Sequence, residues 1–122
     1  MTARRGNVFN SECPSRVVLD ALAEKWVLLI VHVLADGPRR TSELRRAVEG
    51  ISEKMLIQTL RKLERNGFVA RHSFAEVPPR VEYNLTDLGR SLSDAVRALD
   101  NWVEANIGQV MQARESFDAR AE

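Results

Sequence analysis

Four polar side chains gather on one side of residues 52–65 if that segment forms a helix. Lys54, Gln58, Arg61 and Arg65 follow at intervals of three or four residues, which places them on one face at 100° per residue. In the DNA major groove, Lys and Arg can bond guanine O6 and N7, and Gln can bond adenine. Because the opposite side is apolar, the pattern is typical of a helix that packs inward and reads a duplex outward. An ordinary amphipathic helix with a charged solvent face is the alternative.

Position along this helix predicts which part of a duplex each residue contacts. Residues near the N-terminus of a reading helix usually reach the bases, and later residues touch phosphates. The residues expected to contact bases are Lys54, Ile57 and Gln58. Those expected to contact mainly phosphates are Arg61, Lys62 and Arg65. Ser52, the expected N-cap, completes this set of DNA-binding residues.

A shorter helix is expected just before this one and could add phosphate contacts. It begins in Thr41-Ser42-Glu43-Leu44, with Thr41 or Ser42 as its cap, and it ends near Gly50. Free N–H groups and side chains near its start, at Thr41, Ser42 and Arg45, could hold a phosphate. Simple capping is the alternative, and the two roles can coexist.

Two strand-like segments follow, and a loop with consecutive prolines separates them. Residues 68–74 and 81–85 read as strands, the second with clear alternation of apolar and polar residues. The prolines keep the loop extended and stiff, so the segments predict a projecting β-hairpin, or wing. Arg80 beside the loop could enter a minor groove, since narrow A·T tracts attract Arg, with support from Arg71 and His72. A plain solvent-exposed arginine is the alternative.

Cys13 is the single cysteine and the one candidate for covalent chemistry. Pro14 predicts that a helix begins directly after it, and a helix N-terminus stabilises a thiolate. Arg16, one turn on, could add to this effect. Packing of a small apolar residue is the alternative. A disulfide would have to join two subunits or a small thiol, and the lack of an internal pair fits a reducing compartment.

Catalytic and metal-binding patterns are missing from the sequence. It contains no Gly-rich phosphate loop, no nucleophile with an obvious base, and no cluster with metal-ligand spacing. We therefore expect no enzyme activity, no cofactor and no metal.

Composition and charge are those of a soluble globular protein with one domain. The chain has 122 residues, 44% hydrophobic and 29% charged. No apolar run approaches the ~18 residues of a membrane span, and the N-terminus lacks an apolar signal core, so we expect a cytoplasmic, nucleoid-associated protein. Residues 39–72 hold nine Lys/Arg and four Asp/Glu, a net +5, whereas residues 86–122 carry −3. The basic middle favours a face for a polyanion, and a solvated helical surface is the alternative.

Two helices are expected to supply much of the core. One follows Pro14, and the second runs from about Lys25 through Ala35 with a wide apolar surface that marks it as central. His32 within it is expected to be a hydrogen-bonded core histidine rather than a ligand. Four aromatic residues could line a small-molecule pocket between the first, central and last helices, with core packing as the alternative: Phe9, Trp26, Trp102 and Phe117.

The last helix is expected to extend beyond the body. Thr86-Asp87 caps it, and apolar residues recur about every 3.5 residues as far as Val110. Such a helix would reach about 35 Å, and the small body has too little surface to cover its stripe. We therefore expect a second copy of the chain to cover it. The stripe residues expected at this interface are Leu99, Trp102, Val103, Ile107 and Val110.

Four motifs together resemble one family of bacterial regulators. They are Cys13-Pro14, Lys25-Trp26, ISEKMLIQTLRKLERNGFVAR at 51–71 and PPRVEYNLTDLG at 78–89. With them, the chain resembles the HxlR family of winged-helix transcriptional regulators over about residues 13–105. The last two motifs are the specific ones.

The resemblance implies a homodimer that binds pseudo-palindromic operators and represses, or less often activates, nearby genes. It implies that residues 52–65 form the DNA-reading helix and residues 74–80 the wing. It also implies that the first helix joins the last at the dimer interface, which adds Val17 and Val18. Some members sense electrophiles or oxidants through a cysteine at the place of Cys13.

Taken together, the sequence predicts a mainly α (α+β) winged helix-turn-helix with a two-stranded wing and dimerisation helices at both ends. The expected divisions are a flexible arm at 1–12, the domain at 13–111 and a tail at 112–122. The expected partners are double-stranded DNA, a second copy, and a small-molecule or oxidant effector. A winged-helix protein–protein module and an architectural DNA binder without sequence preference are the competing functions.

Overall fold

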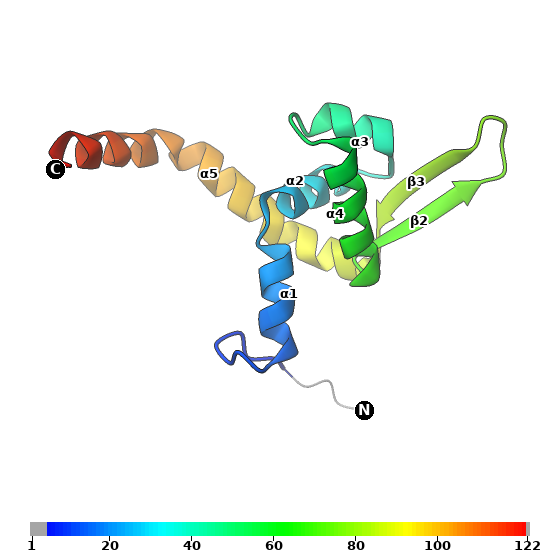
Figure 1. Cartoon of the computed structure of the whole chain (residues 1–122), viewed down its shortest axis with the longest axis horizontal. Helices are drawn as coiled ribbons and strands as arrows, with labels where there is room; N and C mark the ends of the chain where they lie inside the picture. Colours follow the sequence, from blue (N-terminus) through cyan, green and yellow to red (C-terminus); the bar gives the residue numbers. More distant parts are fainter. Residues whose placement is uncertain (1–4, 122) are drawn as a thin grey trace.

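Helix α2 (Lys25–Leu34) forms the centre of the fold because its apolar residues cover more than one face. In the computed structural model, which describes residues 5–121, Val27, Ile30 and Val31 are fully buried and Leu34 is nearly so. The other elements pack around this helix (Figure 1). Those in contact with it are α1 (Pro14–Leu22), α3 (Thr41–Ala47), α4 (Glu53–Arg65), strand β3 (Arg80–Leu85) and α5 (Asp87–Arg120).

The two ends of the chain differ from the expected arm and tail. Of the arm expected over residues 1–12, residues 1–4 lie outside the described part of the chain. Residues 5–12 form a loop whose turns are closed by Asn10 N–H to Asn7 O at 3.2 Å and Cys13 N–H to Asn10 O at 3.0 Å. At the other end, α5 continues to Arg120, so the expected division at residue 112 falls inside a helix.

Helices α3 and α4 form the helix-turn-helix. Ser52 caps α4 as expected, since its hydroxyl accepts the Met55 N–H at 3.1 Å. The expected cap of α3 is wrong. Arg40 occupies that position, and the Glu43 carboxylate accepts the Arg40 N–H at 2.8 Å, which leaves Thr41 and Ser42 inside the helix. Gly67, with φ of +81°, ends α4 in a conformation that other residues adopt only with strain.

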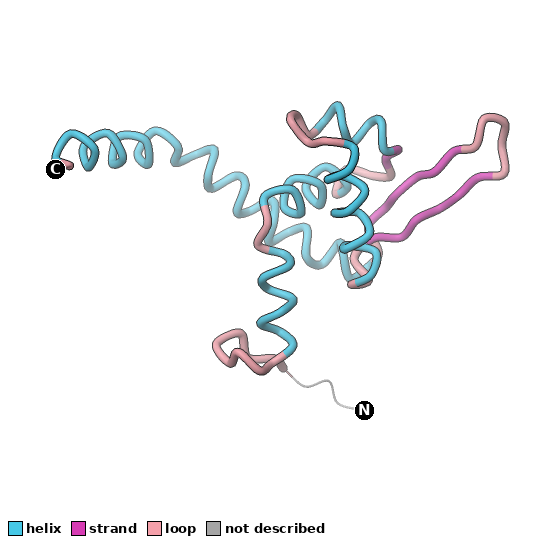
Figure 2. The backbone as a smooth tube through the Cα atoms, in the orientation of Figure 1, coloured by secondary structure: helices cyan, strands magenta, loops and turns pink. Residues whose placement is uncertain are grey.

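The sheet has three strands rather than the two expected. Antiparallel strands β2 (Val69–Phe74) and β3 form the hairpin, and the short strand β1 (Arg39–Arg40) pairs with the other side of β3 (Figure 2). The order is therefore β1-β3-β2. A pair of arginines carries no alternation of apolar and polar residues, so only its partner strand defines β1 as a strand. With this addition, the winged helix-turn-helix expectation is confirmed.

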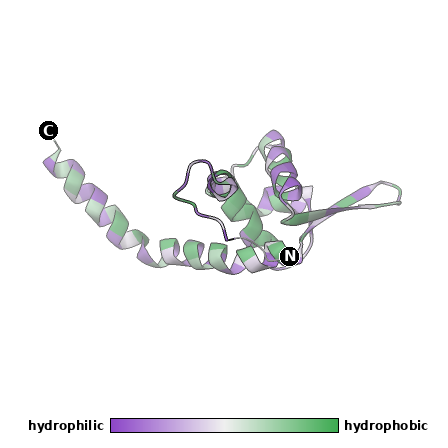
Figure 3. Ribbon diagram, turned by 90° about the horizontal axis from the view of Figure 1, so that it is seen from below, coloured by the Kyte–Doolittle hydropathy of each residue, from purple (hydrophilic) through white to green (hydrophobic). Residues whose placement is uncertain are grey.

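Helix α5 begins inside the body and ends far outside it. Val96 is buried against the core and residues 100–104 still border the body, whereas the helix beyond them projects away from it (Figure 1). Hydrophobic residues nevertheless continue along the projecting part of the helix (Figure 3). With those at the base of this part, the hydrophobic residues of α5 that are exposed in the isolated chain include Leu99, Trp102, Val103, Ile107, Met111 and Phe117.

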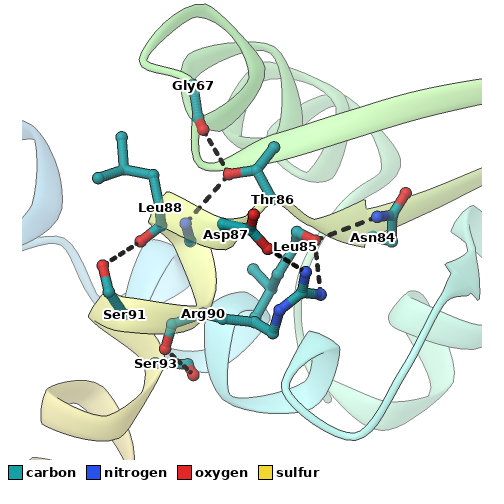
Figure 4. A network of polar contacts seen from close by, with 10 residues as sticks. Gly67, Asn84, Leu85, Thr86, Asp87, Leu88, Arg90, Ser91 and Ser93 are labelled. Atoms are coloured by element: carbon teal, nitrogen blue, oxygen red, sulfur yellow. Dashed lines mark hydrogen bonds and ion pairs between the residues drawn. The ribbon is translucent and has the colours of Figure 1, made fainter.

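The end of α4, the hairpin and the start of α5 meet at Thr86 (Figure 4). Its hydroxyl donates to the Gly67 carbonyl at 2.6 Å and accepts the Gly89 N–H at 3.1 Å. Its own N–H donates to the Phe68 carbonyl at 3.1 Å. Arg90 adds bonds to the Leu85 carbonyl and to the Asp87 carboxylate, at 3.2 Å and 2.6 Å. One short network therefore fixes three elements relative to one another.

The surroundings of two glycines of α5 predict opposite effects of an alanine substitution on the free energy of unfolding. Gly89 lies at this junction, whereas Gly108 lies on the projecting part of the helix. A Cβ at Gly89 would overlap the backbone carbonyl of Phe68, which cannot swing aside, so Gly89→Ala should lower the free energy of unfolding by about 2 kcal/mol or more. At Gly108 a Cβ meets nothing within 4 Å, so Gly108→Ala should raise it by about 0.5–1 kcal/mol. Urea unfolding at one protein concentration measures both. Equal stability of Gly89→Ala and the wild type would contradict the close packing at this junction.

Candidate nucleic-acid interface

One face of α4 is held against the body by buried side chains. Leu56, Leu60 and Leu63 are almost fully buried, and Thr59 lies among them. The Thr59 hydroxyl donates to the Met55 carbonyl at 2.7 Å, which satisfies its polar group inside the core. This burial fixes the rotation of α4 and so determines which side chains face solvent.

The outward face carries the four polar residues that the sequence pattern brings together. Lys54, Gln58, Arg61 and Arg65 are all exposed. Within residues 5–121, none of the three cations among them forms an ion pair. The face therefore presents free positive charge next to an amide that can both donate and accept hydrogen bonds.

Two other residues predicted on α4 are placed differently. The Lys62 ammonium lies 2.9 Å from both carboxylate oxygens of Glu24, the N-cap of α2. It is therefore engaged with the body and is not part of the free cationic face. Ile57 is half-buried and lies at the wall of a hollow between α4 and the sheet.

That hollow brings together two arginines from separate elements. Arg61 of α4 and Arg71 of β2 both line it, together with Glu64 and the ring of Tyr83. Arg71 pairs with Tyr83 across the hairpin, so both side chains lie on the sheet face that meets α4. From the sequence, Arg71 was expected only as a support for Arg80 at the wing. The alternation of Val69 and Arg71 along β2 was the signal that could have assigned it to this face.

A separate patch on α3 combines Ser42 near the start of the helix with two arginines of its last turn. Ser42 and Arg45 are exposed and line a shallow hollow with Arg46, Gly50 and Ile51, whereas Thr41 is half-buried. Arg46 was not singled out from the sequence. It adds a second guanidinium to the same patch, as expected for a surface that touches a phosphate backbone.

Arg80 is held by acidic neighbours within the hairpin. Its guanidinium lies 3.1 Å from the Glu76 carboxylate and 3.6 Å from that of Glu82, and it stacks 4.0 Å from the Phe74 ring centre. The side chain is only 26% exposed. A minor-groove contact by Arg80 would require these ion pairs to open, and the tip beyond it exposes Val77 rather than a cation.

Cys13 lies where the N-terminal loop meets α1. Its sulfur accepts the Asn7 N–H at 3.4 Å and lies 3.1 Å from the Ser15 hydroxyl. The backbone bond from Asn7 and then the contact with Ser15 lower the pKa of the half-buried Cys13 thiol below its ordinary value. Arg16 donates to the Val8 carbonyl at 3.3 Å, so it holds the loop rather than the sulfur.

The residues expected at a dimer interface are largely uncovered. Val17 of α1 and Leu99, Trp102, Val103 and Ile107 of α5 are exposed, while Val18 and Val110 are half-buried. The pocket that the four aromatic residues could have lined is not formed, and three of them are exposed rather than packed in the core. Phe9 lies in the loop before α1 and Phe117 near the far end of α5, on separate extensions of the body (Figure 1). Trp26 packs against the core beneath the Lys25 ammonium, at 4.2 Å.

Neither a metal-binding cluster nor a membrane-spanning helix is present among the described residues. From residue 5 to residue 121, no group of three or more His, Cys, Asp or Glu side chains is placed to hold a metal ion. Over the same span, no helix combines the length and the apolar character needed to cross a membrane. His32 forms a hydrogen bond within the protein, as expected from the sequence: its Nδ1 lies 2.7 Å from the Asp100 carboxylate.

Comparison with known proteins identifies the family. The HxlR-like helix-turn-helix family matches residues 21–111. The chain belongs to this family. A relative of this HxlR-like protein, the HTH-type transcriptional regulator YtfH of Escherichia coli, is 46% identical over 112 residues, which cover 92% of this chain and 89% of YtfH. This HxlR-like protein is accordingly a transcriptional regulator with a helix-turn-helix domain.

Solved structures of related proteins share the fold. The transcriptional regulator ytfH from Salmonella typhimurium is 50% identical and superposes with a TM-score of 0.85, covering 91% of this chain and 99% of its own. The redox regulator HypR in its reduced form is 36% identical, with a TM-score of 0.74 over 81% of this chain and 98% of its own. The similarity therefore extends over the helix-turn-helix and most of the rest of the chain.

The environment of Cys13 predicts a thiolate that forms at lower pH than in a free cysteine. Because the pKa is lowered, the alkylation rate with iodoacetamide should reach half its maximum below the pH found for an unperturbed thiol. Ser15→Ala removes one stabilising contact and should raise that midpoint. Ser11→Ala, an exposed serine of the same loop, serves as the control and should leave it unchanged. A wild-type midpoint equal to that of free cysteine would contradict the prediction.

Proposed function

We propose that this HxlR-like protein is a sequence-specific repressor that binds a pseudo-palindromic operator as a homodimer in the cytoplasm. The observation that carries the proposal is the free face of Lys54, Gln58, Arg61 and Arg65 on the second helix of the helix-turn-helix. A helix of this position and chemistry fits the major groove, where Lys54 and Gln58, with the half-buried Ile57, would reach the bases.

The remaining cations are proposed to hold the phosphate backbone. Arg61 and Arg71 converge on one hollow from α4 and β2, so a phosphate at its mouth could bond both guanidinium groups. Arg65, and the patch of Ser42, Arg45 and Arg46, would contact neighbouring phosphates. Lys62 and Arg80 are already paired with carboxylates, so we assign them smaller contributions.

A second copy would set the distance between two such helices. The exposed apolar stripe of α5, together with Val17 of α1, favours association with another chain that removes it from water. Burying it between two chains would place two copies of α4 in successive major grooves, about 34 Å apart. Binding across a promoter would then block polymerase.

Cys13 is proposed to make the regulator responsive to oxidants or electrophiles. Its lowered thiol pKa favours the reactive thiolate, and HypR, a related structure, is named a redox regulator. Because the chain has no second cysteine, oxidation would form a disulfide with another subunit or with a small thiol. The change at the start of α1 would then reach the dimer interface.

Two substitutions on α4 should separate base reading from phosphate binding. Gln58→Ala should weaken binding to an operator selected from random duplexes by about 1–3 kcal/mol and leave binding to a scrambled duplex unchanged. Arg65→Ala should weaken both and reduce the slope of log K against log salt by about one per subunit. Fluorescence anisotropy at several salt concentrations measures each effect.

The same titrations discriminate the competing functions. Equal loss on both duplexes for Gln58→Ala would refute its base-reading role, and similar wild-type affinity for both would indicate an architectural binder. No binding to any duplex by an intact dimer would favour a protein–protein module.

After diamide treatment in the presence of a small thiol, the affinity of the wild type for the operator should change and that of Cys13→Ser should not.

A charge in the α5 stripe should separate the proposed subunits. Ile107→Glu places a carboxylate in the middle of the stripe, so the protein should sediment as a monomer and bind the operator at least tenfold more weakly. Gln112→Glu adds the same charge at an exposed position on the other side of the helix and should leave the dimer intact. A wild-type monomer in sedimentation velocity, or a dimeric Ile107→Glu, would contradict the assigned interface.

A further inference from the structure

A hollow of about 370 Å³ lies where α5 leaves the body. Helix α2 forms one wall, the end of α3 another, and residues 100–104 of α5 the third. It is separate from both the DNA-binding face and the loop around Cys13. Its volume falls within the range of small-molecule sites, which commonly form between helices.

The interior surface of this hollow is mostly apolar. Leu29 and Val33 come from α2, Val48 follows α3, and Val103 comes from α5. Such a lining favours a hydrocarbon or aromatic group over a fully hydrated ion.

The free charges around the hollow are carboxylates, and His32, which also lines it, is bonded to Asp100. Glu49 and Glu104 line it, are exposed, and form no ion pair with any described residue. Asp100 also lines it, but its carboxylate is bonded to His32. Among the described residues of the lining, none is Lys or Arg. An anionic ligand would therefore meet unbalanced negative charge, whereas a cation would be attracted.

We propose that this hollow binds a small amphipathic organic cation, such as an arylalkyl amine. The apolar part would lie between Leu29, Val33 and Val48, and the ammonium group would lie between the carboxylates of Glu49 and Glu104. The site follows from the lining and its charge and does not depend on DNA binding.

The position of the hollow gives such a ligand a means of regulation, and this step rests on the proposed function. The ligand would touch both the first helix of the helix-turn-helix and the helix proposed to join the subunits. A ligand that favours one angle between α3 and α5 would therefore change the distance between two reading helices and hence operator affinity.

Three probes of one shape and different charge test the site. They are 2-phenylethylamine, neutral 2-phenylethanol and anionic 3-phenylpropanoate, each titrated into the isotope-labelled full chain and followed by methyl and amide NMR shifts. The amine should shift the NMR signals of Leu29, Val33, Val48 and Val103. It should bind several-fold more tightly than the alcohol, and the anion should bind most weakly. No DNA is present, so the outcome does not depend on the operator.

A double variant that removes the free carboxylates of Glu49 and Glu104 tests the role of charge in the proposed site. Glu49→Gln combined with Glu104→Gln should weaken binding of the amine about fivefold and leave binding of the alcohol unchanged, since exposed ion pairs contribute only modestly to affinity. Glu115→Gln, an exposed glutamate further along α5, is the control and should have no effect. The proposal is overturned if the anion binds as well as the amine, if the double variant binds like the wild type, or if a second copy fills the hollow and no probe shifts these residues.

Discussion

The contacts of Thr86 hold together the parts of this protein that must keep a fixed relation. For the proposed DNA recognition, α4 must keep a defined rotation and a defined distance from the proposed dimer contact on α5. The Thr86 hydroxyl and N–H connect the loop after α4 to the first turn of α5, and Gly89 allows that turn to approach the Phe68 backbone closely. The direction of α5 is thus fixed by the same residues that end α4 and begin the hairpin.

Charge divides the surface into regions of opposite sign. The cations of α4 and β2 that face outward are free, while Lys62 and Arg80 are paired with carboxylates of neighbouring elements. Around the hollow between α2, α3 and α5 the free charges are acidic instead. One small body therefore separates a cationic surface from an acidic hollow, although its net charge is only +1.

Much of the fold and of the α4 face could be predicted from the sequence because local signals were strong. Helical periodicity around Leu56, Leu60 and Leu63 fixed which side of α4 is buried, and Ser52 and Thr86 are N-caps with ordinary chemistry. Strand β1 and the cap at Arg40 could not be found in this way, because each is defined by a partner elsewhere.

The same limit applies to individual site residues. The ion pair of Lys62 with Glu24 joins residues that are 38 positions apart, and no spacing rule connects them. Arg71 joins the α4 face only through the register of the hairpin. The hollow at α5 needs three elements in place, so its acidic lining could not be recognised from composition.

The length of α5 has a mechanical consequence. After Glu104, about 16 residues project beyond the body, which at 1.5 Å per residue is a helical arm of roughly 24 Å. A tilt of about 5° at the point where α5 leaves the core would displace the end of this arm by about 2 Å. Small rearrangements near that pivot are thereby amplified along the arm. If the arm packs against the same helix of a second subunit, such rearrangements change the spacing of the two reading helices relative to the two half-sites on the duplex.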